Sequence, residues 1–340
     1  MSHPIPNRSF DQIEKLAENA EEFLGSFFLV TPNTKRAQWD IHNEKIIRNL
    51  ITPSDHSDRP LKIAYLSSYS AQYTRTETLK ALFNTVEADV DYFIYPGNYA
   101  RLLLQTFKIR NQYDIFFIGF RGHEILPFIR LILGSRKKLI FDAFVSVYDT
   151  LCNDRKRFKP GGFFGRLLKK YDTFLCSIAN VVLVDTYSHK EYFEREFLTG
   201  NVEVIYVSCN KSLFKKHTTE GGGYIFWYGA ANPLQGIENI LQWAKSLEGH
   251  AQFILAGPIK KKYEDLVTQL APSNIKFIDY IPYEELPEYM SNAILCLGGH
   301  FSTNPKAQRV IAGKTFQMLE CCDHVLLADN PANREIFPEA

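Results

Sequence analysis

The feature of this sequence that most constrains its fold is an alternation of short apolar, β-branched runs with helical patterns, which occurs twice along the chain. In the first series, strands are expected at Lys62–Ser67, Val90–Tyr95, Asp114–Gly119, Lys138–Phe141, Val181–Val184 and Val202–Val207. In the second, they are expected at Tyr224–Tyr228, Gln252–Ala256, Ile275–Ile278, Ile294–Leu297 and His324–Ala328. Helical patterns lie between the strands, and such repetition is typical of a parallel sheet covered on both faces. The sequence therefore predicts two doubly wound α/β domains.

The boundary between the two series is predicted at Lys215–Gly223, which ends in three glycines. Before the first strand, residues 1–60 are interpreted as a helical extension with helices over 10–27 and 38–50. The expected domains are thus 1–60, 61–215 and 216–340, and 340 residues suit two domains of ordinary size. The chain stops soon after its last expected strand, where a complete domain of this type is expected to continue for another helix or two.

Composition excludes several classes of function. The net charge of +1 argues against a polyanion binder, and no nucleic-acid-binding motif is present. The six cysteines lack the spacing of a zinc site and lie mostly in apolar surroundings, which favours reduced thiols and predicts no metal. The N-terminus is too polar for a signal peptide, and no apolar run reaches the roughly 18 residues of a membrane span. A cytoplasmic protein is expected.

Candidate functional side chains follow the carboxyl ends of expected strands, where ligands bind in open α/β sheets. His123 and Asp142 follow two strands of the first series. In the second series, the cations Lys306, Arg309 and Lys314 precede a helix start, a combination that suits a diphosphate. Glu335 follows the loop after the last strand, where a carboxylate could accept hydrogen bonds from ribose or sugar hydroxyls.

Each candidate also has a purely structural interpretation. The three cations could form a solvated basic helix start, and Glu335 could be an N-cap or first-turn acid. His123 could be a capping or surface histidine, and Asp142 a turn former. Both interpretations stay open for each.

The segment Arg155–Lys170 mixes seven cations with Phe and Leu. One interpretation is contact with an anionic membrane surface. The other, which we prefer at this point, is a loop and a helix whose Phe and Leu face the core.

The richest segment is Gly298–Glu335, and its match to a known pattern is carried by Gly299, Phe301, Thr303, Pro305, Lys306, Ala307, Arg309, Val310, Ile311, Lys314 and Phe316. It resembles the C-terminal half of retaining GT-B glycosyltransferases of the large group 1 class, family 4. Upstream, Gly229 and Gly257 stand where that class has strand-end glycines. Gln235–Ile237 stands where it has a "Lys-Gly-Ile" helix start. In the N-terminal half, Tyr113–Arg121, Phe141–Thr150, Val184–Ser188 and Val204–Phe214 resemble the same branch.

This resemblance implies an α/β GT-B fold, in which two Rossmann-like domains face each other across a cleft. The C-terminal domain would bind a nucleotide-diphosphate sugar as co-substrate, with no further cofactor. Gly229, Gly257, Arg309, Lys314 and Glu335 would contact this donor. Lys306, with the other cations, would stabilise the leaving diphosphate.

The other half of the reaction is implied for the N-terminal domain, where His123 and Asp142 would contact a saccharide or lipid-linked acceptor. Transfer would retain the anomeric configuration and serve polysaccharide biosynthesis. A lipid-linked acceptor would place the protein peripherally at the inner membrane face.

The sequence departs from the pattern at several positions, which include Gln317, Gln235, Glu320 and Cys322–Asp323. Gln317 stands where a glutamate usually contacts the donor ribose, and Gln235 stands for the lysine of the "Lys-Gly-Ile" element. An amide binds a hydroxyl without the strength of a charged acceptor, and Gln317 could equally be a surface helical residue. A non-catalytic nucleotide-binding or scaffold protein of the same fold therefore remains an alternative, as does a nucleotide-sugar epimerase.

Overall fold

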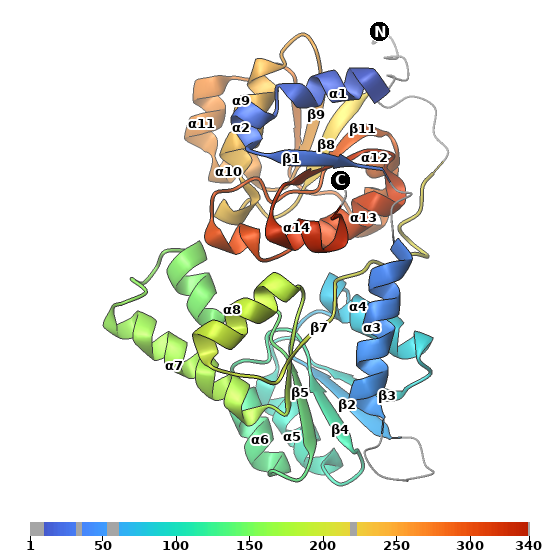
Figure 1. Ribbon diagram of the computed structural model, residues 1–340, viewed down its shortest axis with the longest axis vertical. Helices are drawn as coiled ribbons and strands as arrows, with labels where there is room; N and C mark the ends of the chain where they lie inside the picture. Colours follow the sequence, from blue (N-terminus) through green and yellow to red (C-terminus); the bar gives the residue numbers. More distant parts are fainter. Residues whose placement is uncertain (1–9, 32–35, 53–60, 218–222, 339–340) are drawn as a thin grey trace. The chain divides into compact units, whose positions relative to one another are not determined.

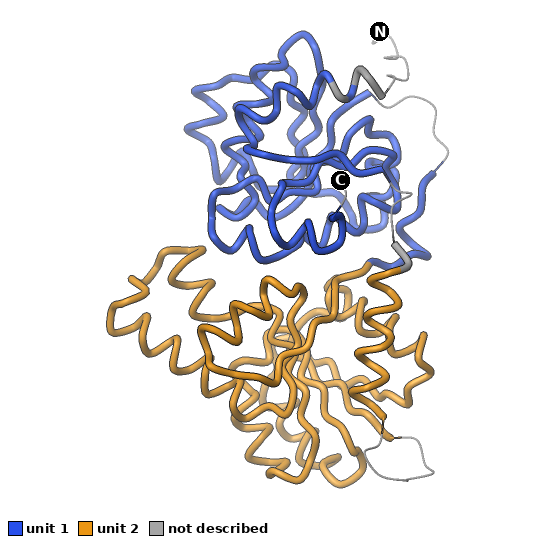
Figure 2. Tube along the Cα trace, viewed as in Figure 1, with its two compact units in different colours: residues 1–35, 209–340 blue, residues 36–208 orange. Residues whose placement is uncertain are grey.

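The computed structural model describes residues 10–31, 36–52, 61–217 and 223–338. Its chain divides into two compact units, shown in Figure 2. Unit 1 consists of residues 1–35 and 209–340, and unit 2 of residues 36–208. The chain therefore passes twice from one unit to the other.

Unit 2 contains a parallel sheet of six strands in the order β3-β2-β4-β5-β6-β7 (Figure 1). The strands are β2 (Lys62–Ser67), β3 (Asp89–Ile94), β4 (Ile115–Ile118), β5 (Lys138–Asp142), β6 (Val181–Val184) and β7 (Val202–Val204). Its helices are α3 (Arg36–Ile51), α4 (Thr74–Thr85), α5 (Tyr99–Ile109), α6 (Leu126–Leu133), α7 (Phe163–Ile178) and α8 (Tyr187–Phe197), with a π-helical turn at Asp149–Asp154. All six predicted strands of this series are confirmed, to within a few residues at their ends.

The sheet of unit 2 is apolar on both faces, as a parallel sheet covered on both sides must be. Ile63, Tyr65 and Phe117 pack with apolar residues of α3 and α4 on one face. Leu66 and Phe116, whose side chains alternate with these, are fully buried as well. The strands of unit 2 are therefore short, nearly continuous apolar runs, and this pattern explains why they can be predicted from the sequence.

Unit 1 contains the second six-stranded sheet, in the order β1-β12-β11-β8-β9-β10. Its strands are β1 (Phe27–Val30), β8 (Tyr224–Tyr228), β9 (Gln252–Ala256), β10 (Ile275–Ile278), β11 (Ala293–Leu297) and β12 (Val325–Ala328). Its helices are α1 (Phe10–Glu18), α2 (Glu21–Leu24), α9 (Ile237–Ser246), α10 (Ile259–Lys262), α11 (Glu264–Leu270), α12 (Leu286–Ser291), α13 (Gly313–Cys321) and α14 (Pro331–Ile336). The five strands predicted for this half are confirmed. The α/β class with two doubly wound sheets is therefore correct.

The prediction of a purely helical extension is wrong at Phe27–Val30, which forms β1. This strand pairs antiparallel with β12, with Phe28 opposite Leu327, and so covers one edge of the sheet. The apolar run FFLV gains burial there that a helix in solvent would not provide, while pairing with β12 satisfies its backbone groups. The linker predicted at 52–60 lies almost entirely outside the described residues.

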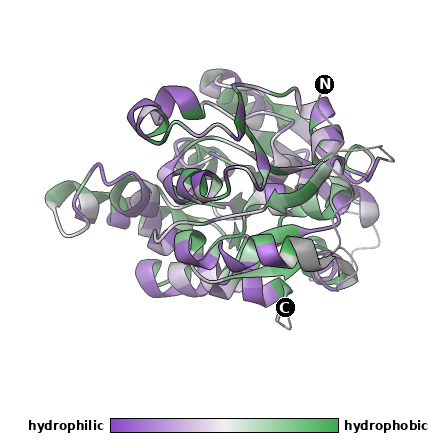
Figure 3. Ribbon diagram, turned by 90° about the horizontal axis from the view of Figure 1, so that it is seen from above, coloured by the Kyte–Doolittle hydropathy of each residue, from purple (hydrophilic) through white to green (hydrophobic). Residues whose placement is uncertain are grey.

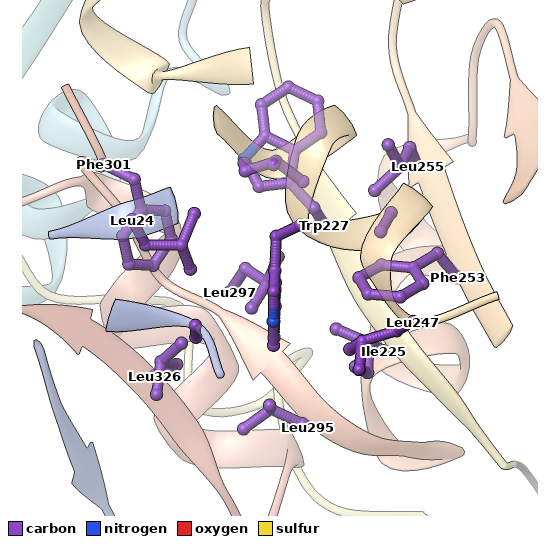
Figure 4. Packing of buried hydrophobic residues seen from close by; sticks show 14 of the residues in the cluster. Leu24, Ile225, Trp227, Leu247, Phe253, Leu255, Leu295, Leu297, Phe301 and Leu326 are labelled. Atoms are coloured by element: carbon purple, nitrogen blue, oxygen red, sulfur yellow. The ribbon is translucent and has the colours of Figure 1, made fainter. Parts of the chain in front are cut away.

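Helices α1 and α2 also belong to unit 1 rather than forming an appendage. Leu16 and Leu24 are buried in one apolar cluster with Trp227, Trp243 and Leu255. Figure 4 shows Leu24 beside Phe301, with Trp227 close by in the same cluster. Helix α3 is bound instead to unit 2, where Asn43 exchanges hydrogen bonds of 3.0 and 2.8 Å with the backbone of Tyr206.

Each sheet has one point at which the order in which successive strands are added reverses. In unit 1, β8 is followed by β9 on one side, whereas β11 is followed by β12 on the other. In unit 2 the same reversal lies between β2 and β4. Ligands of open α/β sheets bind outside the carboxyl ends of the strands at such reversals. The strand order therefore selects two places at which to look for a site.

Candidate functional site

In unit 1 the reversal is lined by two glycine-containing strand ends. Gly229 follows β8, and Gly298, Gly299 and His300 follow β11. Helix α13 begins next to them, since the Thr315 hydroxyl donates to the Gly298 carbonyl at 3.2 Å. Gly229, Gly299 and the start of α13, which belong to the sequence resemblance, thus lie at the edge where a ligand is expected.

Lys314, in the first turn of α13, has its side chain buried at this point, with 8% of the residue exposed. Its Nζ donates to Gln235 Oε1 at 2.8 Å and to the Tyr228 carbonyl at 3.2 Å, and lies 4.2 Å from the centre of a Trp227 ring. Both hydrogen-bond acceptors are neutral. Burial lowers the pKa of Lys314 well below its usual range. A cation at this place loses its solvation and also lies at the positive end of a helix dipole, so its charged form is unfavourable unless an anion binds beside it.

Two glycines border this ammonium and place no side chain of their own in the space beside it. A Cβ atom on Gly229 or on Gly299 would lie 3.8 Å from Lys314 Nζ, one from each strand end. Gly257, after β9, supports the first loop, because a Cβ there would come 2.1 Å from the Gly229 carbonyl oxygen. Gly229 thus borders the lysine directly, whereas Gly257 lies behind it.

Two further basic side chains lie close to Lys314. Lys306, in the 3₁₀ turn Pro305–Gln308, is buried with 5% exposed. Burial and the charges of Lys314 and Lys306 lower the pKa of His300 to about 3, so this imidazole is neutral at pH 7. The His300 Nδ1 atom is buried and has no hydrogen-bond partner within the described part of the chain. The interpretation of a solvated basic helix start is therefore wrong for Lys306 and Lys314.

The remaining predicted donor residues differ in their surroundings. Gln317 is buried: Tyr228 donates its hydroxyl hydrogen bond to the Gln317 amide oxygen, and the Gln317 nitrogen donates to Tyr283 at 3.1 Å. It is not a surface residue, and both ends of its amide are occupied by protein. Arg309 follows the 3₁₀ turn and is half-buried.

Glu335 is half-buried in the second turn of α14, so it is neither an N-cap nor a first-turn acid. The N-cap of that helix is Asn330, which accepts from the Asn333 backbone.

In unit 2, Asp142 does not have a free carboxylate. It is the last residue of β5 and is fully buried against Arg75, whose Nε and Nη2 lie 3.0 and 2.8 Å from Asp142 Oδ1. Arg75 also donates to the carbonyls of Ile205 and Val184, which follow or end neighbouring strands. Asp142 therefore holds the carboxyl ends of β5, β6 and β7 together, and it is not a turn former.

His123 is buried as well, contrary to its interpretation as a surface histidine. Its Nε2 donates to the Val145 carbonyl at 2.8 Å, and its own carbonyl accepts from the Tyr171 hydroxyl at 2.8 Å. Burial lowers the pKa of His123, so the ring is neutral. It ties the loop after β4 to the loop after β5.

An aromatic cluster that the sequence did not single out lies at the same edge of unit 2. Tyr73 stacks on Phe120 with ring centres 4.3 Å apart, and Tyr69 and Phe144 approach the same Phe120 ring at 5.0 and 5.6 Å. The Arg121 guanidinium lies 5.7 Å from the Tyr69 ring. These residues follow β2, β4 and β5, on both sides of the reversal, and all four rings are half-buried. Half-exposed aromatic faces suit the apolar faces of sugar rings.

Within the described ranges, no group of three or more His, Cys, Asp and Glu side chains could hold a metal ion. Over those same residues, no helix has both the length and the apolar character to cross a membrane.

The solved structures that are similar to this chain over most of its length include the following two. Sucrose-phosphate synthase from Thermosynechococcus elongatus is 13% identical, over 70% of this chain and 75% of its own, with a TM-score of 0.54. The glycosyltransferase AviGT4, involved in avilamycin A biosynthesis, is 14% identical over 82% of each chain, also with a TM-score of 0.54.

The chain has the GT-B fold. Neither a family model nor a curated protein matches the sequence. At such low identity the structural likeness establishes the fold alone, and the activity has to be inferred from the residues at the strand ends.

Proposed function

We propose that this chain is a glycosyltransferase that moves a sugar from a nucleotide-diphosphate donor to a saccharide or lipid-linked acceptor, with retention of configuration. The single observation that carries the proposal is Lys314, a buried lysine at the start of α13 with only neutral acceptors among its described hydrogen bonds. A diphosphate placed between Gly229 and Gly299 would supply the missing negative charge.

In the proposed reaction the bond between the anomeric carbon and the phosphate oxygen breaks, and negative charge grows on the diphosphate. Lys314 and Lys306 stabilise this charge in a site from which water is largely excluded, where such interactions are strongest. The acceptor hydroxyl forms the new glycosidic bond, and its proton leaves with the diphosphate. Neither a metal nor a protein nucleophile takes part in this scheme.

Four further residues complete the proposed donor site. Arg309 and Glu335 remain proposed ligands of the phosphate and of a sugar or ribose hydroxyl. Gln317 is proposed as a positioning residue, because its amide is bonded to Tyr228 and Tyr283 and Tyr228 supplies a carbonyl to Lys314. His300 is added to the proposed site as a neutral hydrogen-bonding group with a free Nδ1 atom.

For the acceptor, the aromatic residues Tyr69, Tyr73 and Phe120 of unit 2 are proposed as the contact surface, with Arg121 beside them. Asp142 and His123 are proposed to act through the shape of this edge, because their polar atoms bind Arg75 and the Val145 carbonyl.

The proposal is tested by titrating the protein with UDP, GDP and their sugars. Lys306→Ala is expected to weaken nucleotide binding strongly, whereas Lys276→Ala, at an exposed position on β10, leaves it unchanged. Absence of binding to every nucleotide would remove the proposal. Binding without turnover for any acceptor would favour the non-catalytic alternative, for which the occupied amide of Gln317 is the motivating observation. Donor conversion without an acceptor would indicate an epimerase.

A further inference from the structure

Helices α5, α6 and α7 of unit 2 lie side by side, α5 beside α6 and α6 beside α7. Each buries one side, for example Leu102, Ile129 and Leu175. The other side of each helix exposes large apolar residues, namely Leu104 and Phe107 on α5, Phe128 and Leu131 on α6, and Phe163, Phe164, Leu167 and Phe174 on α7. These eight residues are called the α5–α7 face.

Side chains of the α5–α7 face are more exposed than residues at the margin of a hydrophobic core. Leu104, Leu131 and Phe163 are 65%, 82% and 72% exposed. The preferred sequence interpretation, in which the Phe and Leu of Arg155–Lys170 face the core, is therefore wrong for Phe163, Phe164 and Leu167. Apolar side chains gathered on three adjacent helices mark an interaction surface.

The three helices and the segment that leads into α7 carry cations but no exposed acid. Helices α5 and α6 contain no Asp or Glu, and the one acid of α7, Asp172, is buried. The segment Arg155–Lys170 carries seven cations and no acid, and all but Lys169 are exposed. Lys169 is paired with Glu196 of α8 at 2.9 Å. The other six cations of the segment keep a net positive charge beside the exposed Phe and Leu.

We infer that the α5–α7 face docks the protein on an anionic membrane surface. Exposed Phe and Leu enter the headgroup region while neighbouring Lys and Arg contact lipid phosphates, the combination found in interfacial helices. A second copy of this chain is a poor occupant, because two faces of the same positive sign repel each other. The inference does not depend on the proposed glycosyl transfer.

The shape of unit 2 agrees with such a role. Figure 1 shows the segment that leads into α7 extending outward from the sheet of this unit. In Figure 3, where this segment lies at the left, apolar stretches in green alternate with polar ones in purple. Phe158 and Phe164 contact each other there, with ring centres 5.3 Å apart.

The test is co-sedimentation of the intact protein with vesicles of phosphatidylcholine alone and of phosphatidylcholine with phosphatidylglycerol. We expect binding to the anionic vesicles, weakened by 0.5 M salt, because salt shortens the Debye length below its value of about 10 Å at 0.1 M. Phe163→Ser and Leu167→Ser are each expected to lower the partition coefficient roughly tenfold, since each removes most of one inserted side chain. Tyr280→Ser, an exposed aromatic position of unit 1, is the matched control.

Charge is tested separately. Arg166→Gln and Lys170→Gln should each weaken binding roughly fivefold, at about 1 kcal/mol per cation, whereas Lys45→Gln and Lys276→Gln, exposed cations off the face, should not. All substituted residues are exposed, and circular dichroism of each variant serves to check that it folds. Equal binding to both vesicle types, or no effect of the face variants, overturns the inference. Two other results also overturn it. One is dimerisation without vesicles that Phe163→Ser abolishes, and the other is binding of an acidic protein in place of lipid that Phe163→Ser abolishes.

Discussion

Replacing Lys314 by Met is the most direct probe of the proposed donor site, because Met keeps the length and removes the charge. In the protein as described, Lys314 Nζ makes hydrogen bonds of 2.8 Å and 3.2 Å to neutral acceptors. A hydrogen bond from an ammonium to a phosphate is worth about 1.5–3 kcal/mol. The variant should therefore bind UDP or GDP roughly 10- to 150-fold more weakly.

The same variant should change the proton balance of binding. Burial lowers the pKa of Lys314 well below its usual range, and a bound diphosphate would raise it again. Between these two pKa values, nucleotide binding takes up a proton, so affinity falls as the pH rises through the pKa of the free protein. At lower pH, where Lys314 is already charged, no proton is taken up by it.

Isothermal titration calorimetry in buffers of different ionisation enthalpy measures both effects in one experiment. Lys276→Met, at an exposed lysine of the same unit, is the control and should match the wild-type protein. A Lys314→Met variant that is folded and binds nucleotide with unchanged affinity and unchanged proton uptake would refute the assignment of Lys314 as a phosphate contact.

Three further predictions concern stability. Gly236→Ala places a Cβ 1.9 Å from the Phe301 carbonyl oxygen at a φ of +69°, whereas Gly249→Ala, at a φ of +78°, meets open space. In urea titrations the first variant should lose well over 1 kcal/mol of its free energy of unfolding and the second about 1 kcal/mol. Equal losses would contradict the clash. Burial raises the pKa of Asp172 to about 6. Its protonated form therefore favours folding, and that contribution to stability is lost as the pH rises from about 4 through 6. Asp172→Asn should gain stability relative to the wild-type protein over this range, and a pH-independent difference would contradict this prediction. Gln235→Lys adds a second ammonium beside the buried lysine and should lower Tm without ligand but give a larger Tm increase with UDP than wild type, a result that equal increases would exclude.

The fold could be predicted largely from sequence because its strands are buried on both faces and therefore read as short continuous apolar runs. Lys62–Ser67, Val181–Val184 and Tyr224–Tyr228 were predicted with the bounds that the structure gives. The strand Phe27–Val30 was missed because its pairing with β12 links residues about three hundred positions apart. No local pattern distinguishes such an edge strand from the end of an amphipathic helix.

The candidate site was predictable only in part. Residue type and position after a strand selected Lys306 and Lys314, but their burial depends on how two loops close over them. The sequence could not show that Gln317 is bonded at both ends, or that Asp142 is matched by Arg75. His300 was missed, although its position after a strand-end Gly-Gly pair was a signal of the kind used for the others.

The antiparallel strand at the edge of unit 1 has a consequence for dissecting the molecule. Residues 36–208 can be expressed as one continuous piece, but residues 209–340 on their own would leave the β12 backbone without its neighbour and expose an apolar sheet edge, which invites aggregation. A soluble, isolated unit 1 should therefore require the first 35 residues, supplied as a separate peptide or rejoined to the other segment by a designed connection.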